Sequence, residues 1–404
     1  MISVDEALQR ILGGAKPLGP EQVSLADALG RTLAADVAAR RTQPPAAMSA
    51  MDGYAVRGAD VAKLPATLTQ VGSVPAGQNY PHALKPGECV RIFTGAPLPD
   101  GADTVVIQED TEVAGNRVTM KDARAGKHVR KAGIDFREGD VVLHAGRVLT
   151  PRDVGLAAAA NVPWLPVARK PRVAILPTGD EVVMPGEPVG PNQIVSSNGP
   201  ALAAFVRACG GEPLLLGVAP DDAQQLQAMV AAARGVDLLV TTGGASVGEH
   251  DLVRDALGAE GMKLDFWKIA MRPGKPLIFG RLGAVPVLGL PGNPVSAIVC
   301  AAIFLRPLLD ALLGAARPLE ETKPTAKLSQ PLAANDRRQD YIRAALARDA
   351  AGALTVAPYP VQDSSMVSVL ARSDALIVRK PGAPAAAIGD TVEILPLGHG
   401  ALGI

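Results

Sequence analysis

Short apolar segments alternate with glycine-rich and proline-rich loops in the middle of the chain. Three of these transitions read RVAILPTGDE at 172–181, VDLLVTTGGASVGEHD at 236–251 and PVLGLPGNPVSA at 286–297. Each apolar run is rich in valine, leucine and isoleucine without polar alternation, which is typical of a parallel strand buried between helices. Parallel strands end at one edge of their sheet, and ligands bind there in open α/β folds. The pattern therefore predicts one site built from these loops.

The patterns on either side predict further structural units. The start of the chain indicates two short helices, the second around 24–35, and a proline-led helix over 151–160 could pack back on them. Strands alternate with helices in the middle, with a long last helix to Leu313, which predicts parallel βαβ units. Short β-forming runs split by turns come before and after that region. We therefore expect four units: a composite of 1–45 with 136–169, a β-rich insert at 46–135, an α/β domain at 170–318, and a β barrel or sandwich at 319–404.

Composition argues against several classes of function. The 40 basic and 40 acidic side chains cancel, so no net field attracts nucleic acid or an anionic membrane. Aromatic residues make up only 3%, which argues against stacking platforms for single-stranded nucleic acid. The opening MISVDEALQRIL predicts a capped amphipathic helix rather than a signal peptide. The apolar stretch 295–305 stops at Arg306, short of the roughly 20 residues that span a bilayer. With three scattered cysteines, we expect a soluble, cytoplasmic protein.

The first two loops combine carboxylates with glycine. Gly243, Gly244 and Ser246 would form an anion cradle, and Glu181 and Asp251 lie beside such loops. Mg²⁺ commonly takes one or two carboxylates together with phosphate oxygens, so these two acids are the candidate metal ligands. The alternative is a solvated turn acid for Glu181 and a helix N-cap for Asp251.

Other polar residues stand at predicted helix starts. Ser196, Ser197 and Asn198 precede a helix in a position suited to an anion, although capping by Asn198 explains the pattern equally well. Asp221 has the same two interpretations, a helix cap or a contact to a ligand hydroxyl or base. In the third loop, Asn293 can cap a helix whose first residue is Pro294, which would leave N–H groups aimed at the crevice.

A cationic turn follows the second loop. In a strand, Lys268 and Arg272 would project from the same face, and the turn at 273–274 would bring Lys275 close to them. Three cations around one turn predict an anion clamp. The chain has no P-loop, no GxGxxG after a strand, no HExxH, no CxxC and no GxSxG. These features favour phosphoryl, nucleotidyl or metal transfer over acyl or hydride transfer.

The sequence resembles the molybdopterin molybdenumtransferase family, which includes MoeA and the gephyrin E-domain. The resemblance rests on TGDE, GGASVGEHD, MRPGKP and GLPGNPVS in this order, together with SAMDGYAV, RIFTGAPLPDGADTVV, GIDFREGD and QDSSMVSVLARSDALIV outside the α/β region. It implies a four-part chain with a composite domain, an inserted β domain, a nucleotide-fold α/β domain and a carboxyl-terminal β barrel. It also implies a homodimer in which the insert of one protomer faces the α/β site of the other.

The resemblance implies a reaction and its participants. Family members take adenylylated molybdopterin and molybdate with Mg²⁺, hydrolyse the adenylyl phosphoanhydride, release AMP and leave molybdenum on the dithiolene sulfurs. Protein partners would be a molybdopterin adenylyltransferase and the molybdoenzymes that receive the cofactor. The two alternative functions are a dimeric molybdopterin-binding scaffold, since the gephyrin domain binds receptor tails, and the adenylyl transfer that precedes molybdenum insertion.

The family's functional positions carry over residue by residue. The catalytic positions are Asp52, Thr94, Asp135, Glu181, Asp221 and Asp251. The cationic positions are Lys268, Arg272 and Lys275, and the proline loop comprises Pro291, Gly292, Asn293 and Pro294. Arg343 and Ser364 match positions of the last domain near the oxyanion. Molybdate about 4 Å from a singly charged phosphate would cost about 8 kcal/mol at an effective dielectric of 20, which three cations and Mg²⁺ can offset.

Overall fold

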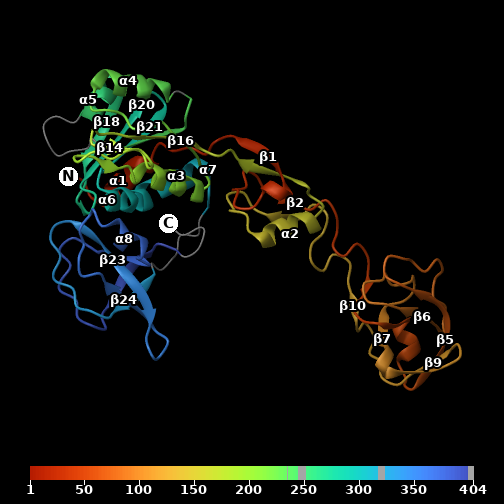
Figure 1. Ribbon diagram of the computed structural model, residues 1–404. Coiled ribbons are helices and arrows are strands. Elements are labelled where there is room, and N and C mark those ends of the chain that lie inside the picture. The colour runs from red at the N-terminus through yellow and green to blue at the C-terminus, as the bar shows by residue number, and fades with distance from the viewer. Residues whose placement is uncertain (234, 244–251, 317–323, 399–404) are drawn as a thin grey trace.

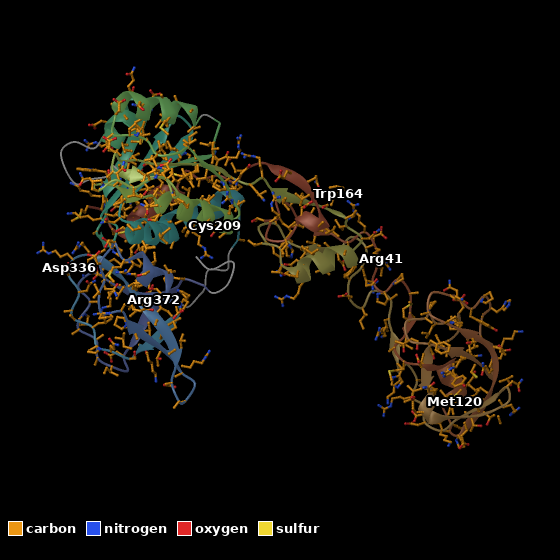
Figure 2. All side chains as sticks on the ribbon, viewed as in Figure 1. Arg41, Met120, Trp164, Cys209, Asp336 and Arg372 are labelled. Carbon is orange, nitrogen blue, oxygen red and sulfur yellow. The ribbon has the colours of Figure 1, made fainter. Side chains whose placement is uncertain are left out.

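The chain is elongated, with its domains in a row. Figure 1 shows the α/β domain and the carboxyl-terminal barrel together at one end, the inserted domain at the other end, and a small composite domain between them. This computed structural model describes residues 1–233, 235–243, 252–316 and 324–398. The labelled Met120 of the insert and Cys209 of the α/β domain lie in well-separated parts of the molecule in Figure 2.

The α/β domain contains a six-stranded mixed sheet in the order β16-β13-β17-β21-β20-β18. The first four strands are parallel, as predicted, whereas β20 and β18 run antiparallel at the far edge. The reason is a tight turn at Gly283, with φ of +60°, that joins β20 directly to β21 without a crossover helix. The strands are β13 Arg172–Pro177, β16 Glu212–Leu215, β17 Leu238–Thr242, β18 Met262–Lys268, β20 Pro276–Leu282 and β21 Val285–Leu290.

Helices cover both faces of this sheet and a small parallel strand pair stands near its edge. The helices are α3 Asn198–Ala208, α4 Ala223–Ala232, α5 Leu252–Ala259, α6 Pro294–Cys300, the π-helical η4 Ala301–Leu305 and α7 Arg306–Leu313; the pair is β14 Val182–Val183 with β15 Ile194–Val195. The helical run Pro294–Leu313 has 20 residues and a mean hydropathy of 1.9, enough by length and composition to cross a membrane. Its side chains are mostly buried in the main core of the protein, where Phe304 and Leu309 are fully covered.

Helix α1, Val4–Leu12, packs on the α/β domain rather than with the strands that follow it. As predicted, Ser3 caps the helix by accepting a hydrogen bond from the Glu6 N–H at 3.1 Å. Its apolar face, Val4, Ala7 and Ile11, is buried in the same core as α7.

The composite domain is built from short strands and one helix. Strand β1, Pro20–Ser24, pairs with β12, Trp164–Ala168, and β2, Val37–Ala38, pairs with β11, Val141–Leu143, beside α2, Pro151–Ala159. The predicted helix over 24–35 is wrong, since only the 3₁₀ turn η1 at Leu25–Asp27 forms there. Backbone N–H groups of that segment instead bond to carbonyls of 147–149 and 166, so tertiary hydrogen bonds override the local preference.

The inserted domain and the barrel are the predicted β-rich units. The insert has a sheet in the order β7-β4-β6-β5-β9-β8, and β3 pairs with β10 where it joins the composite domain. In the barrel, the pairing of β23 with β25 closes five strands, and β19 from the α/β domain adds to β23. The insert comprises β3 Met48–Ser49, β4 Gly53–Val56, η2 Gly58–Val61, β5 Ala66–Val74, β6 Glu88–Ile92, β7 Thr104–Ile107, η3 Gln108–Asp110, β8 Thr111–Ala114, β9 Arg117–Met120 and β10 Val129–Arg130. The barrel comprises β22 Thr325–Leu328, β23 Gln339–Arg348, β24 Leu354–Pro358, α8 Val367–Ala371, β25 Ala375–Arg379 and β26 Thr391–Pro396, and the added β19 of the α/β domain is Met271–Arg272.

The packing of α1 predicts a stability effect in the α/β domain. Ile11→Ala should lower the free energy of unfolding by about 2–5 kcal/mol, because the side chain is fully buried and its removal leaves a cavity. Urea denaturation in a Trp164→Phe background measures this through Trp267, which packs against the α/β core. Gln9→Ala on the exposed face is the matched control. An equal midpoint for Ile11→Ala and its parent would contradict the assignment of α1 to this core.

Candidate active site

The predicted loops meet in one cavity at the carboxyl ends of the parallel strands. The cavity has a volume of about 730 Å³ and lies between the ends of β13, β17 and β21 and the start of α3. The sequence-predicted residues that line it are Glu181, Ser197, Asn198, Gly243, Pro291, Gly292, Asn293 and Pro294. Gly244, Ser246 and Asp251 lie outside the described residues.

Close backbone contact fixes the loops around the cavity. Gly243 has φ of +98°, and a Cβ atom there would lie 2.3 Å from the Thr178 carbonyl oxygen. A Cβ atom on Gly292 would lie 3.3 Å from the Gly243 Cα. Only glycine permits the first conformation and the first approach, so the glycine content of the loops predicted from sequence has a structural reason.

Asn198 joins three of the loops through hydrogen bonds. Its Nδ2 donates to the Thr242 Oγ1 at 2.9 Å and to the Gly292 carbonyl at 2.7 Å. The Thr242 hydroxyl in turn donates to the Pro291 carbonyl at 3.0 Å. Asn198 is the first residue of α3 and its side chain makes no capping bond, so its side chain serves the cavity wall rather than the helix end.

The third loop leads into α6 under the barrel. Pro294 occupies the first turn of α6, as predicted, and the Val295 N–H donates to the Ser364 carbonyl at 3.1 Å. That N–H is therefore not aimed at the crevice, contrary to the expectation from sequence. A segment of the barrel contacts the start of α6 instead, and Ser365 and Val367 of that segment line the cavity.

The acids of the predicted site have different surroundings. The Glu181 carboxylate is exposed on the cavity wall and folds over Gly179, where a Cβ atom would lie 2.6 Å from its Oε2. Asp221 is exposed outside this cavity, and its N–H donates to the Asp180 carboxylate at 2.9 Å. Among the described residues, no group of three or more acidic, histidine or cysteine side chains could hold a metal ion by itself.

The cationic turn differs from the sequence prediction. Strand β18 ends at Lys268, whereas Arg272 belongs to β19 and pairs with the barrel, so the two side chains do not project from one strand. Lys268 places its Nζ 3.6 Å from the centre of the Trp267 ring. Within the described part of the chain, neither Lys268 nor Lys275 has an ion-pair partner. These two lysines therefore keep their charge available.

Arg272 is already neutralised by acids of the barrel. Its guanidinium lies 3.5 Å from Asp336 and also bonds to the buried Asp340. The hydrogen bond to Asp340 raises the pKa of Arg272 above its usual value. Part of its charge is therefore committed to the domain contact rather than to a ligand.

Arg343 holds the barrel segment that contains Ser364. The Arg343 side chain is buried, and it donates to the carbonyls of Asp363 at 2.8 Å and Met366 at 3.2 Å. Burial lowers the pKa of this guanidinium. Arg343 thus holds the segment that contains Ser364 and Ser365 against the cavity, and does not itself line it.

Asp52 and Thr94 form a unit in the insert. The Asp52 Oδ1 accepts from the Thr94 N–H at 2.8 Å and from its hydroxyl at 2.9 Å. These two bonds, the backbone bond first, lower the pKa of Asp52. Gly53 fixes the position, because a Cβ atom there would lie 2.0 Å from the Val106 carbonyl oxygen.

Asp52, Thr94 and Asp135 do not reach the cavity within one chain. The insert stands at the opposite end of the molecule from the α/β domain (Figure 1). Asp135 is exposed beside Phe136 and Asp140 in a shallow depression of the composite domain. The structure therefore gathers the predicted residues into separate groups rather than into one site.

Comparison with known proteins explains this set of domains. Family models match in chain order: the MoeA N-terminal region (domain I and II) over 2–161, the probable molybdopterin binding domain over 174–311, and the MoeA C-terminal region (domain IV) over 325–397. The molybdopterin molybdenumtransferase 2 of Mycobacterium tuberculosis is 38% identical, with 82% of this chain and 85% of that protein covered. The molybdopterin molybdenumtransferase of Haemophilus influenzae is 33% identical over 99% of both chains.

The chain belongs to the molybdopterin molybdenumtransferase family.

A solved structure agrees with this assignment along the whole molecule. The molybdopterin biosynthesis MoeA protein from Pyrococcus horikoshii matches with a TM-score of 0.86 at 30% identity, covering 99% of this chain and 100% of that one. The resemblance noted from sequence is confirmed, and so is the multidomain fold of α/β and β units. This transferase acts in molybdenum cofactor biosynthesis.

Some residues around the cavity and around Asp52 were not among the predicted site residues. Thr178 and Ser196 line the cavity and are almost fully buried. Arg91 lies between the rings of Tyr54 and Phe93, at 5.1 and 5.0 Å, and donates to the Gly53 carbonyl beside Asp52. Hydroxyls at the end of a buried strand were a usable signal for Thr178, whereas only the paired strands β4 and β6 reveal Arg91.

The Asp52 unit predicts a measurable titration change. Thr94→Val removes the hydroxyl donor but keeps the backbone donor, so the pKa of Asp52 should rise and still remain below its ordinary value. Carboxyl-detected NMR titration of Asp52 measures the shift. Thr119→Val, on the same domain, should leave this pKa unchanged. A pKa of Asp52 unaffected by Thr94→Val would show that the hydroxyl bond does not form.

Proposed function

We propose that this molybdenumtransferase binds adenylylated molybdopterin and molybdate in the α/β cavity. The phosphoanhydride of the substrate is hydrolysed, AMP leaves, and molybdenum passes to the dithiolene sulfurs. The observation that carries this proposal is the single cavity at the ends of β13, β17 and β21, in a chain whose relatives are named for molybdenum transfer. Backbone groups of Gly243, Gly292 and Asn293 lie on its wall, where glycine permits close approach of phosphate oxygens.

Mg²⁺ fits the donor chemistry of this wall. Glu181 presents an exposed carboxylate to the cavity, and Asp251 follows the β17 loop in sequence. One or two carboxylates with phosphate oxygens are the donor set that Mg²⁺ prefers. We propose that Glu181 and Asp251 hold the ion, which when bound offsets the negative charge of the phosphoanhydride. The residues of the chain would orient the bond that breaks.

Lys268 and Lys275 are the proposed cations for molybdate. Both keep their charge free of ion pairs within the described residues, whereas Arg272 shares its charge with two barrel acids. Arg272 would then add to the local potential and fix the barrel, rather than bind the oxyanion alone. Arg343 would support the same region by holding the Ser364 segment. Asp221, exposed beyond the cavity, would contact the adenylyl part of the substrate.

We propose that two chains complete the site. Asp52 and Thr94 form an exposed, hydrogen-bonded unit, yet the insert lies far from the cavity of its own chain. A homodimer with a two-fold axis would bring each insert to the cavity of the partner subunit. Asp135, between insert and composite domain, would take part there. The protein would work in the cytoplasm, receive substrate from an adenylyltransferase and pass the cofactor to molybdoenzymes.

Removing the carboxylate of Glu181 tests the chemistry. Glu181→Gln should reduce Mg²⁺-dependent AMP release by at least about 100-fold, because a preorganised charge at the reacting phosphate is lost. Release of AMP from adenylylated molybdopterin with molybdate and Mg²⁺ is the assay, and far-ultraviolet circular dichroism checks the fold. Glu212→Gln, an exposed acid at the other end of the sheet, is the control. Wild-type activity in Glu181→Gln would remove this residue from the mechanism.

Mixed dimers test the shared site. Asp52→Asn and Glu181→Gln homodimers should both be inactive, but unfolding and refolding them together should restore about a quarter of the wild-type activity, since each heterodimer regains one intact site. AMP release after mixing is the measurement, and each variant refolded alone is the control. Absence of any recovery, with heterodimers demonstrated by differently tagged chains, would place Asp52 and Glu181 in the same chain's site or outside it.

A further inference from the structure

Three polar atoms in the wall of the cavity are buried without a hydrogen-bond partner among the residues that the structure describes. They are the Thr178 Oγ1, the Ser196 Oγ and the Asn198 Oδ1. Thr178 is 3% exposed and Ser196 is 5% exposed. Buried polar atoms in proteins are nearly always bonded to protein, water or ligand. A group of them facing one cavity therefore indicates that its occupant supplies the partners.

The orientation of the Asn198 amide is fixed by its neighbours. The Gly292 carbonyl can only accept a hydrogen bond. The Thr242 hydroxyl uses its hydrogen in the bond to the Pro291 carbonyl, so toward Asn198 it can only accept as well. The Asn198 NH₂ group must therefore face Gly292 and Thr242, because the opposite orientation would bring oxygen against two acceptors. The unpartnered atom is consequently the carbonyl Oδ1, a pure acceptor.

An acceptor that is fixed in this way selects the chemistry of its ligand. Molybdate and the ionised phosphates of the substrate present only acceptors, and so they cannot satisfy the Asn198 Oδ1. A ring N–H, an amino group or a hydroxyl can. The Thr178 and Ser196 hydroxyls can donate or accept, so they fit a ligand edge that carries both kinds of group. The shared requirement is an uncharged edge with at least one donor.

The rest of this wall suits a flat ring. Pro177, Val182, Ile194, Val195 and Pro291 line the cavity. Their aliphatic surfaces can cover the faces of a planar heterocycle while a few polar atoms fix its edge, as in most small-molecule sites. A ribose is not planar and would use this surface less completely. Pro291 comes from the loop that contains Gly292, and none of these aliphatic side chains comes from the turn of Lys268, Arg272 and Lys275.

We infer that Asn198, Ser196 and Thr178 form a neutral subsite that holds the amino-bearing pyrimidine edge of the pterin, separate from the oxyanion positions. The inference rests on the proposed function, since it assigns one part of that substrate to one part of the cavity. It changes the role expected for Asn198 from the sequence. The amide oxygen of Asn198 accepts a hydrogen bond from the ligand and does not bind an oxyanion. The exposed Ser197, next in sequence, takes no part in this subsite.

Ligand pairs that differ in one group test the Asn198 contact. Pterin carries a 2-amino group, and lumazine carries a carbonyl oxygen in its place. The wild-type protein should bind pterin at least about tenfold more tightly than lumazine, because the 2-amino donor meets Oδ1, whereas the lumazine carbonyl at the same position would set one acceptor against another. Asn198→Ala should abolish this preference, whatever it does to overall affinity. Quenching of the fluorescence of both compounds measures binding.

The two hydroxyls provide a test that separates binding from folding. Ser196→Ala with Thr178→Val should weaken pterin binding about tenfold, while the melting temperature stays equal or rises, because neither hydroxyl has a hydrogen-bond partner in the described part of the chain. Ser73→Ala, at an exposed serine of the insert, is the matched control and should change neither quantity. Binding of molybdate and AMP should remain within about twofold of wild type in the double variant, in the control variant and in Asn198→Ala.

Several results would overturn the inference. Equal affinity of the wild type for pterin and lumazine, or no measurable binding of either at millimolar concentration, excludes the amino contact. If the double variant lost affinity for AMP but kept its affinity for pterin, the subsite would be assigned to the ribose of AMP. A marked fall in melting temperature of the double variant would make the hydroxyls structural. Release of AMP by the wild type tests the proposed function separately, and it can succeed while the pterin preference fails.

Discussion

The hydrogen-bond bridge from Asn198 to Thr242, Gly292 and Pro291 is the constraint on which the candidate site depends. It connects the first turn of α3 to the ends of β17 and β21, which are far apart in sequence. Gly243, which follows Thr242, lies against the Thr178 carbonyl at a distance that no residue with a Cβ atom permits. The glycines therefore do more than approach a ligand. They allow the loops to be hydrogen-bonded to one another, and that bonding fixes which polar atoms face the cavity.

The barrel makes the same region rigid from the other side. The Ser364 carbonyl takes the first free N–H of α6, and Arg343 holds the segment that contains Ser364 through two carbonyl bonds. Arg272 links β19 to Asp336 and Asp340 across the domain contact. Tyr341, Leu376 and the α6 side chains also share one apolar core. The barrel is thus part of the cavity wall. Arg272 and Arg343 mainly hold this wall in place, through ion pairs and hydrogen bonds within the protein, and contribute less charge to a bound ligand.

Local patterns predicted most of the architecture, and they failed where distant contacts decide. Continuous apolar runs identified β13, β17 and β21 because both faces of these strands are covered. The helix expected over 24–35 did not form, since its backbone groups bond to residues more than 100 positions away. Alternation placed Lys268 and Arg272 on one strand, but pairing of β19 with β23 divides them. The sequence placed Ser196 and Ser197 together at a helix entry, and only the folded chain distinguishes the buried hydroxyl of Ser196 from its exposed neighbour.

Separation of the Asp52 unit from the cavity follows from how the insert is attached. Two segments of the chain connect the composite domain to the insert, and the pairing of β3 with β10 holds these segments together. Such a connection places the insert beyond the composite domain instead of over the α/β domain. The Asp52 carboxylate nevertheless has features of a prepared site: a fixed position beside Gly53, two donors from Thr94 and a nearby arginine between two rings. A carboxylate that only capped a turn would need the Thr94 N–H but not the Arg91 side chain near it, and this difference supports the proposal that the unit faces a neighbouring chain's cavity.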